Sequence, residues 1–161
     1  MQRLRGRVQA GKGDAARWLL RFNAAYSRKL GRTIYPGSLN LALEHNFNWF
    51  DPAYQAHRIW FGREAYGCER DILQLPCELI VPDKRKAWLW TTTTAAQEHL
   101  DSRVIELLSD ARLREAYALE DGSILELSLS LTPSAGQAGP FPAPWVSGAS
   151  KRWLGARRSV N

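Results

Sequence analysis

Leucine alternates with polar residues in the stretch Leu125-Glu126-Leu127-Ser128-Leu129-Ser130-Leu131. Successive side chains of a β-strand point to opposite faces, so this period of two predicts a strand with one buried face. The turn signal Asp121-Gly122 stands shortly before it. The same alternation occurs over residues 39–43, directly after a Pro-Gly turn signal. Both stretches favour a β-sheet protein.

The rest of the chain adds short strands and little helix. Strands are predicted over residues 4–10, 17–20, 69–81 with a break near Pro76, 87–94 and 104–108. A helix is predicted from Asn23, its N-cap, to Leu30 before the stop signal Gly31, and a second from the N-cap Asp110 to Tyr117. The aromatic-rich residues 45–67 favour loops and short strands. This pattern predicts an all-β barrel or sandwich with two short helices.

The 161 residues are enough for one domain, predicted over residues 1–131. Residues 132–161 are rich in Pro, Gly, Ala and Ser and carry only basic charges, which predicts a flexible tail. No apolar run is long enough for a membrane-spanning helix, and no apolar segment follows the basic start as in a secretory signal. Two cysteines, Cys68 and Cys77, are too few for a disulfide scaffold. We therefore expect a cytoplasmic protein that binds no membrane.

The net charge of +6 is unevenly distributed along the chain. It is +8 over residues 1–32, −6 over residues 33–131 and +4 over residues 132–161. Positive ends around an acidic middle indicate anionic partners at particular places.

Two short motifs have residue types suited to phosphate and metal. Gly11 and Gly13 follow a predicted strand, where backbone N–H groups can approach a phosphate and Lys12 and Arg17 supply charge. Two glycines taken by themselves favour the alternative, an ordinary hairpin loop. Ser38 and Asn40 lie two residues apart and so share a face of a strand, where two neutral oxygens can hold Mg²⁺. A plain turn capped by the Asn40 side chain is the alternative.

Two further features allow a ligand role. Glu106 stands in an apolar run, where a carboxylate needs either a ligand or an arginine partner, or must face solvent. Arg112 and Arg114 begin the second predicted helix, which suits a phosphate or a nucleobase edge, although a solvated helix has the same pattern. The three histidines have no metal-binding spacing, and the aromatic run fits a core as well as a planar ligand.

In this order, the pieces resemble the archaeal-type CTP-dependent riboflavin kinase family. The matching segments are Gly6-Arg7-Val8, Gly11-Lys12-Gly13-Asp14-Ala15, Lys29-Leu30-Gly31, Tyr35-Pro36-Gly37-Ser38-Leu39-Asn40-Leu41, Arg103-Val104-Ile105-Glu106-Leu107-Leu108, Leu113-Arg114 and Leu119-Glu120-Asp121-Gly122. The resemblance covers about residues 4–131. It implies that the chain folds as a small six-stranded cradle-loop β-barrel.

The resemblance also implies an activity and its residues. The family transfers the γ-phosphoryl group of CTP to the 5′-hydroxyl of riboflavin, giving FMN, with a divalent metal such as Mg²⁺. Carried over by position, the nucleotide contacts are Lys12, Gly13, Asp14, Ala15, Ala16, Arg17, Ala111, Arg112, Leu113 and Arg114. The metal ligands are Ser38 and Asn40, and the flavin contacts are Thr94 and Glu106. The expected partners are the small molecules riboflavin and CTP, bound by a monomer.

Two departures from the family pattern bear on activity. Ala15 replaces a third glycine of the loop, which would disfavour a positive φ and add a methyl group near the phosphates. Ser38 replaces a threonine and keeps its hydroxyl. The competing hypothesis is a barrel without catalysis, which binds flavin, nucleotide or, through its basic ends and aromatic residues, nucleic acid.

Overall fold

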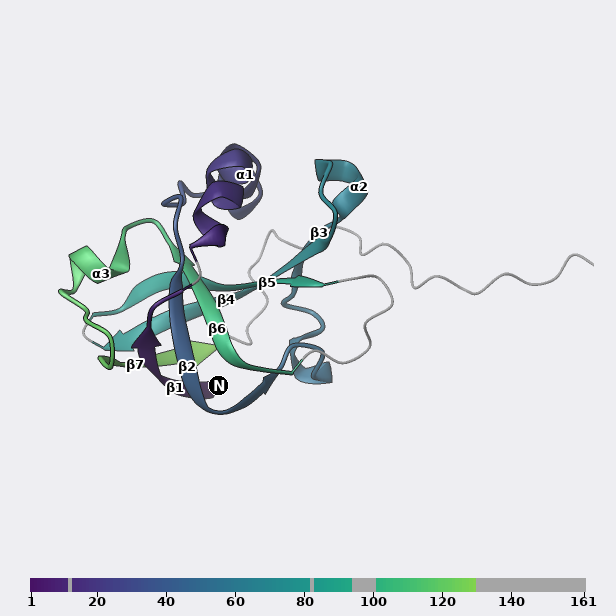
Figure 1. Cartoon of the computed structure of the whole chain (residues 1–161). Coiled ribbons are helices and arrows are strands. Elements are labelled where there is room, and N and C mark those ends of the chain that lie inside the picture. The colour runs from purple at the N-terminus through teal and green to yellow at the C-terminus, as the bar shows by residue number, and fades with distance from the viewer. Residues whose placement is uncertain (12, 82, 94–100, 130–161) are drawn as a thin grey trace, which may run out of the picture.

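The leucines that alternate in residues 125–129 lie buried in the last strand of a β-barrel (Figure 1). This computed structural model describes residues 1–11, 13–81, 83–93 and 101–129. The elements in chain order are β1 (Gln2–Gln9), α1 (Asp14–Leu30), β2 (Leu39–Asn48), the 3-10 helix η1 (Pro52–Tyr54), β3 (Ile59–Phe61), α2 (Arg63–Tyr66), β4 (Asp71–Val81), β5 (Arg85–Thr93), β6 (Asp101–Ser109), α3 (Leu113–Ala116) and β7 (Ile124–Leu129).

Six antiparallel strands close the barrel in the order β4-β5-β6-β2-β1-β7, because β7 pairs with β4 as well as with β1. The short strand β3 pairs with the part of β4 that lies outside the β7 pairing. Closure satisfies backbone groups that an open sheet would leave unpaired at its edges. The six-stranded barrel that the family resemblance implies is confirmed, and of the two folds that the sequence pattern allowed, barrel or sandwich, the chain forms the barrel.

Leucine fills most of the barrel interior. Among the leucines of this interior cluster, five are 0% exposed: Leu41, Leu73, Leu79, Leu89 and Leu127. Strand β2 leaves no room for a side chain at Gly6 of β1, where a Cβ would lie 2.7 Å from the carbonyl oxygen of Ala42. Only glycine fits this position without a shift of the backbone.

Helix α1 starts nine residues earlier than the sequence pattern predicted. The predicted strand over residues 17–20 and the predicted N-cap at Asn23 are both wrong, because the helix begins at Asp14 after Gly13. The Asn23 amide instead donates to the carbonyl oxygen of Ile34 at 2.5 Å. The predicted stop is confirmed, since Gly31 ends the helix in the left-handed conformation with φ 65°.

Packing explains the longer helix. Leu19, Phe22, Tyr26 and Leu30 recur at helical spacing and are all buried. They face the outer side of β4 and β5 and form a second apolar cluster there, called the α1 layer below, which also holds Ile34, Phe61, Ile72, Trp88, Trp90 and Leu108. Of the apolar stretch at 18–20, only Leu19 is buried on this helix face, while Trp18 is half-buried and Leu20 is exposed.

Other local predictions need correction. Strand β4 is not broken at Pro76, which lies between the residues that pair with β3 and those that pair with β7, in a gap that tolerates a missing N–H. The aromatic-rich region contains the short helix α2 as well as β3 and η1, so the described chain holds more helix than predicted. Asp110 caps no helix, because α3 begins at Leu113 and the Asp110 carboxylate pairs with Arg85 at 2.6 Å.

The described residues bear on two expectations from the sequence, one about a membrane-spanning helix and one about the cysteines. Among these, no helix combines the length and the apolar character needed to cross a membrane. Cys68 and Cys77 are both free thiols, as expected. The tail predicted over residues 132–161 lies outside the described residues.

Candidate active site

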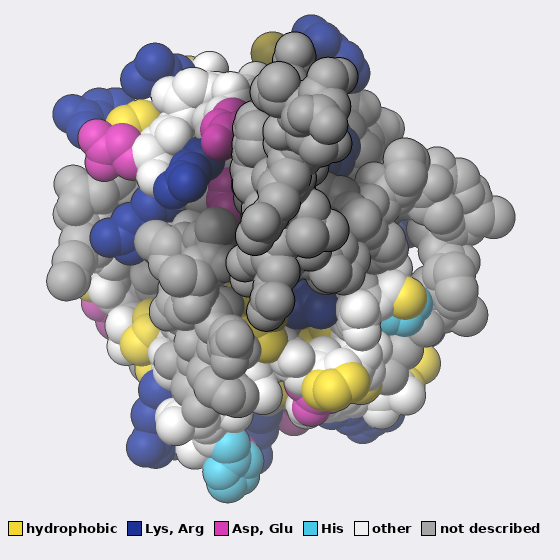
Figure 2. Space-filling view, turned by 90° about the vertical axis from the view of Figure 1, so that its right-hand side faces the viewer, with side chains coloured by type: hydrophobic (Ala, Val, Ile, Leu, Met, Phe, Trp, Pro, Cys, Tyr) yellow, Lys and Arg dark blue, Asp and Glu magenta, His cyan; other side chains and the backbone are white. Residues whose placement is uncertain are grey.

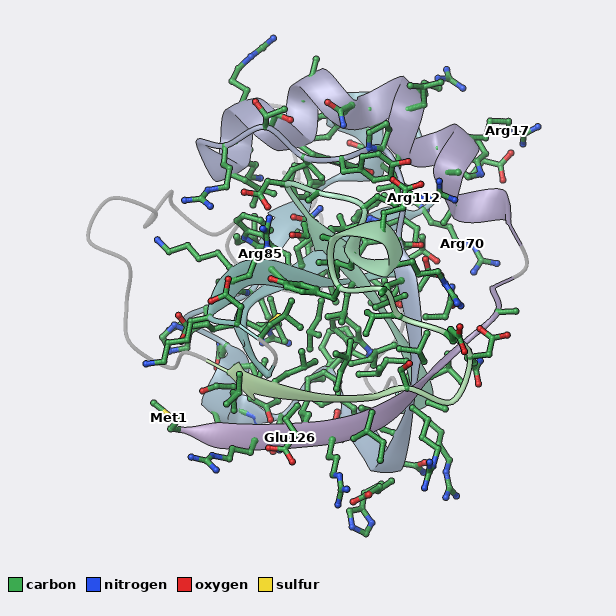
Figure 3. All side chains as sticks on the ribbon, turned by 90° about the vertical axis from the view of Figure 1, so that its left-hand side faces the viewer. Met1, Arg17, Arg70, Arg85, Arg112 and Glu126 are labelled. Atoms are coloured by element: carbon green, nitrogen blue, oxygen red, sulfur yellow. The ribbon has the colours of Figure 1, made fainter. Side chains whose placement is uncertain are left out.

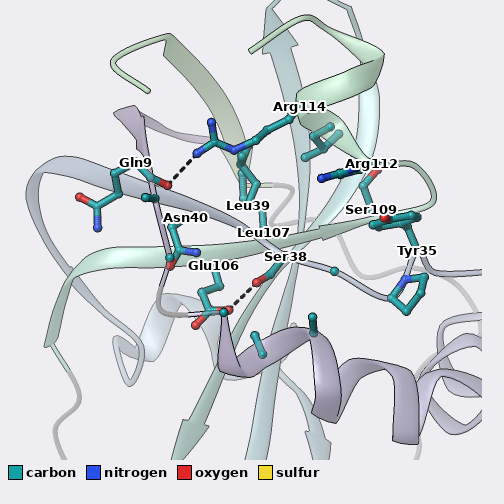
Figure 4. A pocket seen from close by; sticks show the side chains of 18 of the residues that line it. Gln9, Tyr35, Ser38, Leu39, Asn40, Glu106, Leu107, Ser109, Arg112 and Arg114 are labelled. Carbon is teal, nitrogen blue, oxygen red and sulfur yellow. Dashed lines mark hydrogen bonds between the residues drawn. The ribbon is translucent and has the colours of Figure 1, made fainter. Parts of the chain in front are cut away.

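A cavity of about 760 Å³ opens between the start of α1, strands β2 and β6, and α3 (Figure 4). Its lining comes from four separate segments of the chain. These contribute Gln9–Gly11, Gly13, Ala15 and Ala16, then Tyr35–Asn40, then Val104, Glu106, Leu107 and Ser109, and finally Ala111–Arg114. The cavity thus gathers residues from each segment to which the sequence assigned phosphate or metal, together with Glu106, but it does not include Arg17.

The glycine loop reaches the cavity at the first turn of α1. Gly13 has φ 81°, which favours glycine, and Ala15 and Ala16 line the cavity beside it. The first backbone N–H groups of a helix have no partner within the helix and carry partial positive charge. This end of the cavity therefore suits an anion.

Alanine at position 15, where the family has a third glycine, does not strain the backbone. Ala15 lies inside α1, and among the described residues other than glycine only Ala118 has a positive φ. The expected conflict between an alanine and a positive φ is therefore wrong. Alanine is the residue that a helix favours most.

Arg17 is not brought to the cavity. Its side chain is exposed, packs over the Trp18 ring at 5.3 Å, and points outward from the end of α1 (Figure 3). Lys12 and the side chain of Asp14 lie outside the described residues, as does Thr94, so their predicted contacts stay predictions.

Ser38, Asn40 and Glu106 meet across two strands. The pairing of β2 with β6 places Asn40 opposite Glu106. The Ser38 hydroxyl donates to Glu106 Oε2 at 2.6 Å, as drawn in Figure 4. Burial raises the pKa of Glu106, and the Ser38 hydrogen bond opposes part of that rise. Glu106 pairs with no arginine in the described structure, so the ion-pair alternative is not realised.

Asn40 owes its place to Gly11. A Cβ on Gly11 would lie 2.2 Å from Asn40 Nδ2, so the amide occupies the space that the missing side chain leaves. Asn40 makes no side-chain hydrogen bond to another described residue, although it lines the cavity. Its amide oxygen is thus available to a ligand.

The donor set fits a hard cation. The Ser38 hydroxyl hydrogen is held by Glu106, which leaves the oxygen lone pairs available, and the Asn40 amide supplies a second neutral oxygen. Mg²⁺ is often held by few protein oxygens, with waters and substrate phosphates completing its shell. Within the described chain, no group of three His, Cys, Asp or Glu residues could hold a metal by itself. The two oxygens therefore suit a cation that arrives with a phosphate ligand.

Segment 111–114 closes the cavity opposite α1. Arg114 Nη2 donates to the carbonyl oxygen of Gln9 at 3.1 Å and pairs with Asp121 at 2.5 Å, so it ties α3 to the strand before the glycine loop. Arg112 also lines the cavity and pairs with Glu115. The segment brings two guanidinium groups to a site that already presents helix amides.

Tyr35 and Ser109 line the cavity but were not singled out from the sequence. Their backbones are joined, because Tyr35 N–H donates to the carbonyl oxygen of Ser109 at 2.8 Å. Gly37 lets the tyrosine ring fold back, since a Cβ there would lie 2.8 Å from Tyr35 Cε1. The turn sequence Tyr35-Pro36-Gly37 was the one signal in the sequence that could have pointed to Tyr35.

The positive charge of the N-terminal segment is distributed over several surfaces. Arg5 lies between Glu44 and Glu126, at 3.8 and 3.9 Å, and Arg32 pairs with Asp110 at 3.5 Å. Figure 2 shows Lys and Arg side chains in several separate groups on the face it presents. Part of the +8 segment is therefore balanced by the acidic middle of the chain.

The fold and the cavity together define a small β-barrel whose ligand site combines helix amides, arginines and hard oxygen donors. Comparison with known families agrees with this class. Residues 8–129 match the family CTP-dep_RFKase, described as "Domain of unknown function DUF120". The chain belongs to this family, the archaeal-type CTP-dependent riboflavin kinases.

Curated relatives are similar over most of the chain. Riboflavin kinase of Staphylothermus marinus is 25% identical over 125 residues, which are 78% of this chain and 89% of that protein. Riboflavin kinase of Pyrobaculum aerophilum is 28% identical over 80% of this chain, and that of Pyrobaculum arsenaticum is 26% identical over the same share. The match spans 61% of the length of each Pyrobaculum protein.

Glu106→Gln is expected to make the protein more stable than wild type at neutral pH. Below the ordinary carboxyl pKa of 4.5, Glu106 is protonated in both folded and unfolded chains and the two proteins differ little. As pH rises, the unfolded chain ionises first, so wild type loses stability until the raised folded pKa is passed. Urea unfolding of both proteins across this range measures the difference. A difference that shrinks as pH rises would contradict the assigned burial.

Proposed function

We propose that the chain is a riboflavin kinase that transfers the γ-phosphoryl group of CTP to the 5′-hydroxyl of riboflavin, giving FMN, with Mg²⁺. One observation carries the proposal: a single cavity collects the glycine loop, Ser38, Asn40, Glu106 and segment 111–114. Ser38 and Glu106, which are 68 residues apart, are directly hydrogen bonded there. The family and the names of the relatives support the same activity.

The phosphates of the donor belong at the start of α1. Unpartnered helix amides near Gly13 and Ala16 face the cavity, and Arg112 and Arg114 stand on its opposite side. Phosphoryl transfer depends on positioning and charge stabilisation more than on covalent chemistry by the protein. These groups supply both.

Ser38 and Asn40 would hold the metal. When bound there, Mg²⁺ would neutralise charge on the phosphate oxygens. Glu106 fixes the direction of the Ser38 hydroxyl, because it accepts that hydrogen. The residues beneath the reacting phosphate are thereby oriented before the substrates arrive.

Glu106 is also the residue that would meet riboflavin. Its side chain lines the cavity opposite Asn40, so a hydroxyl hydrogen bonded to the carboxylate lies beside the phosphate site. The carboxylate would orient the 5′-hydroxyl toward the γ-phosphorus. Thr94 remains a predicted second contact.

The choice of donor and the competing hypotheses are tested in one assay. The protein is incubated with riboflavin, Mg²⁺ and either CTP or ATP, and FMN is measured by chromatography. We expect FMN with CTP and little with ATP. Riboflavin binding without FMN would favour a flavin-binding barrel, and salt-dependent oligonucleotide binding without FMN would favour a nucleic-acid-binding barrel.

A further inference from the structure

Gln74, in the middle of β4, has a side chain that nothing in the described structure satisfies. It is 0% exposed, yet neither its amide oxygen nor its amide nitrogen has a hydrogen-bond partner. A buried amide without partners destabilises a fold, and such a group calls for an explanation by function, water or ligand. An apolar residue of the same size would make the fold more stable here.

Strand register places Gln74 on a continuous row with the candidate active site. Gln74 lies opposite Trp90 on β5, Trp90 lies opposite Glu106 on β6, and Glu106 lies opposite Asn40 on β2. Cross-strand partners share one face of a sheet, so these side chains line the outer face of the barrel wall. Two strand spacings separate Gln74 from Glu106, a span of about 10 Å.

The space above this row is the α1 layer. Trp90 lies in it, and Tyr26 of α1 packs into the same cluster. Trp90 Nε1 and the Tyr26 hydroxyl are also buried in this layer, where the two side chains interact with each other. The Gln74 amide therefore stands unsatisfied beside an otherwise mostly aromatic and aliphatic layer next to the cavity.

We propose that Gln74 binds the pyrimidine edge of the riboflavin ring. This inference rests on the proposed function. The edge presents a carbonyl oxygen, the N3–H and a second carbonyl oxygen, and a primary amide complements it by accepting from N3–H and donating to a carbonyl. With the 5′-hydroxyl at Glu106, the ribityl chain and ring run along the row past Trp90 to Gln74.

The ring occupies the α1 layer only when α1 and the Trp90 indole move outward, because Gln74 is closed off in this structure. The layer offers the aromatic and aliphatic surface that a planar ring needs, and the Gln74 amide gains partners when the ring is bound. The unpaired Gln74 amide weakens the packing of the layer and favours its opening.

The test compares riboflavin with 3-methylriboflavin, in which a methyl group replaces the N3 hydrogen. Dissociation constants are measured by flavin fluorescence for wild type, Gln74→Leu, Gln74→Met and the control Ser128→Ala, which removes a buried hydroxyl on β7. We expect Gln74→Leu and Gln74→Met to bind riboflavin about 10- to 100-fold more weakly, the loss for one unpaired buried group. Ser128→Ala should bind as wild type does.

Methylation of the flavin at N3 distinguishes a loss of hydrogen bonding to N3–H from a change in the packing around Gln74. Wild type should bind 3-methylriboflavin about 10- to 100-fold more weakly than riboflavin, and the Gln74 variants should scarcely distinguish the two. Equal binding of both flavins by wild type, or equal riboflavin affinity of wild type and Gln74→Leu, would overturn the assignment while leaving the kinase proposal standing. If wild type binds no riboflavin at all, the proposed function itself fails. The wild-type comparison holds even where a variant does not fold.

Discussion

Asn40→Ala is expected to lower the rate of FMN formation by about 100-fold or more, which corresponds to the several kcal/mol that a metal supplies to a charged transition state. Asn40 lines the cavity opposite Glu106 and has no side-chain hydrogen bond to another described residue. Its removal should therefore leave the melting temperature nearly unchanged. Steady-state rates over a range of Mg²⁺ concentrations, beside thermal unfolding, measure the two effects.

Asn40→Asp is the matched control, because it keeps an oxygen ligand at the same position. It should retain much more turnover than Asn40→Ala at saturating Mg²⁺. The metal assignment would be wrong if Asn40→Ala turned over like wild type with the same Mg²⁺ dependence.

Gly11→Ala is expected to reduce turnover by about 100-fold, the scale on which a displacement of about 1 Å affects catalysis. The new methyl group would lie 2.2 Å from Asn40 Nδ2, so the amide must leave its place in the cavity. The defect should include a higher Mg²⁺ requirement, because the displaced residue is a proposed metal ligand. Turnover at increasing Mg²⁺ measures it.

Gly67→Ala controls for general damage by a glycine substitution. Gly67 has φ 63° and no neighbour within 4 Å of its Cβ position, so this change strains the backbone away from the cavity. It should cost about 1 to 3 kcal/mol of folding free energy and leave turnover intact. The proposed link between Gly11 and Asn40 fails if both variants lose stability alike and neither loses activity.

Strand patterns were the most predictable part of the fold. The leucines at 39, 41 and 43 and at 125, 127 and 129 alternate strictly, and the structure buries all six. Alternation reports a local property, the side of the strand on which each residue lies. The closed order of the barrel depends on pairing between distant strands and came from the family resemblance.

The start of α1 could not be predicted from the local sequence. Gly13 supplies no side-chain cap, and the apolar residues that follow it fit a strand as well as a helix. The segment forms a helix rather than a strand because a helix places Leu19, Phe22 and Tyr26 on one side, where the outer face of β4 and β5 buries them. Because Arg17 lies in this helix, its side chain points away from the cavity in which it was expected to contact the nucleotide.

The site was predictable as a set of segments and not as a set of contacts. The motifs at Ser38, Asn40 and Glu106 were recognised separately, each with an ordinary alternative. The hydrogen bond between Ser38 and Glu106 exists only because β2 pairs with β6. Gln74 gave no signal, since a glutamine in a strand becomes notable only once its burial is known.

The most direct test of the account follows the phosphoryl group itself. Wild-type protein is given riboflavin, Mg²⁺ and CTP labelled in the γ-phosphate, and the products are separated by chromatography. We expect labelled FMN formed in step with CDP, and almost none with Asn40→Ala. Release of labelled inorganic phosphate without labelled FMN, or no consumption of CTP by wild type, would contradict it.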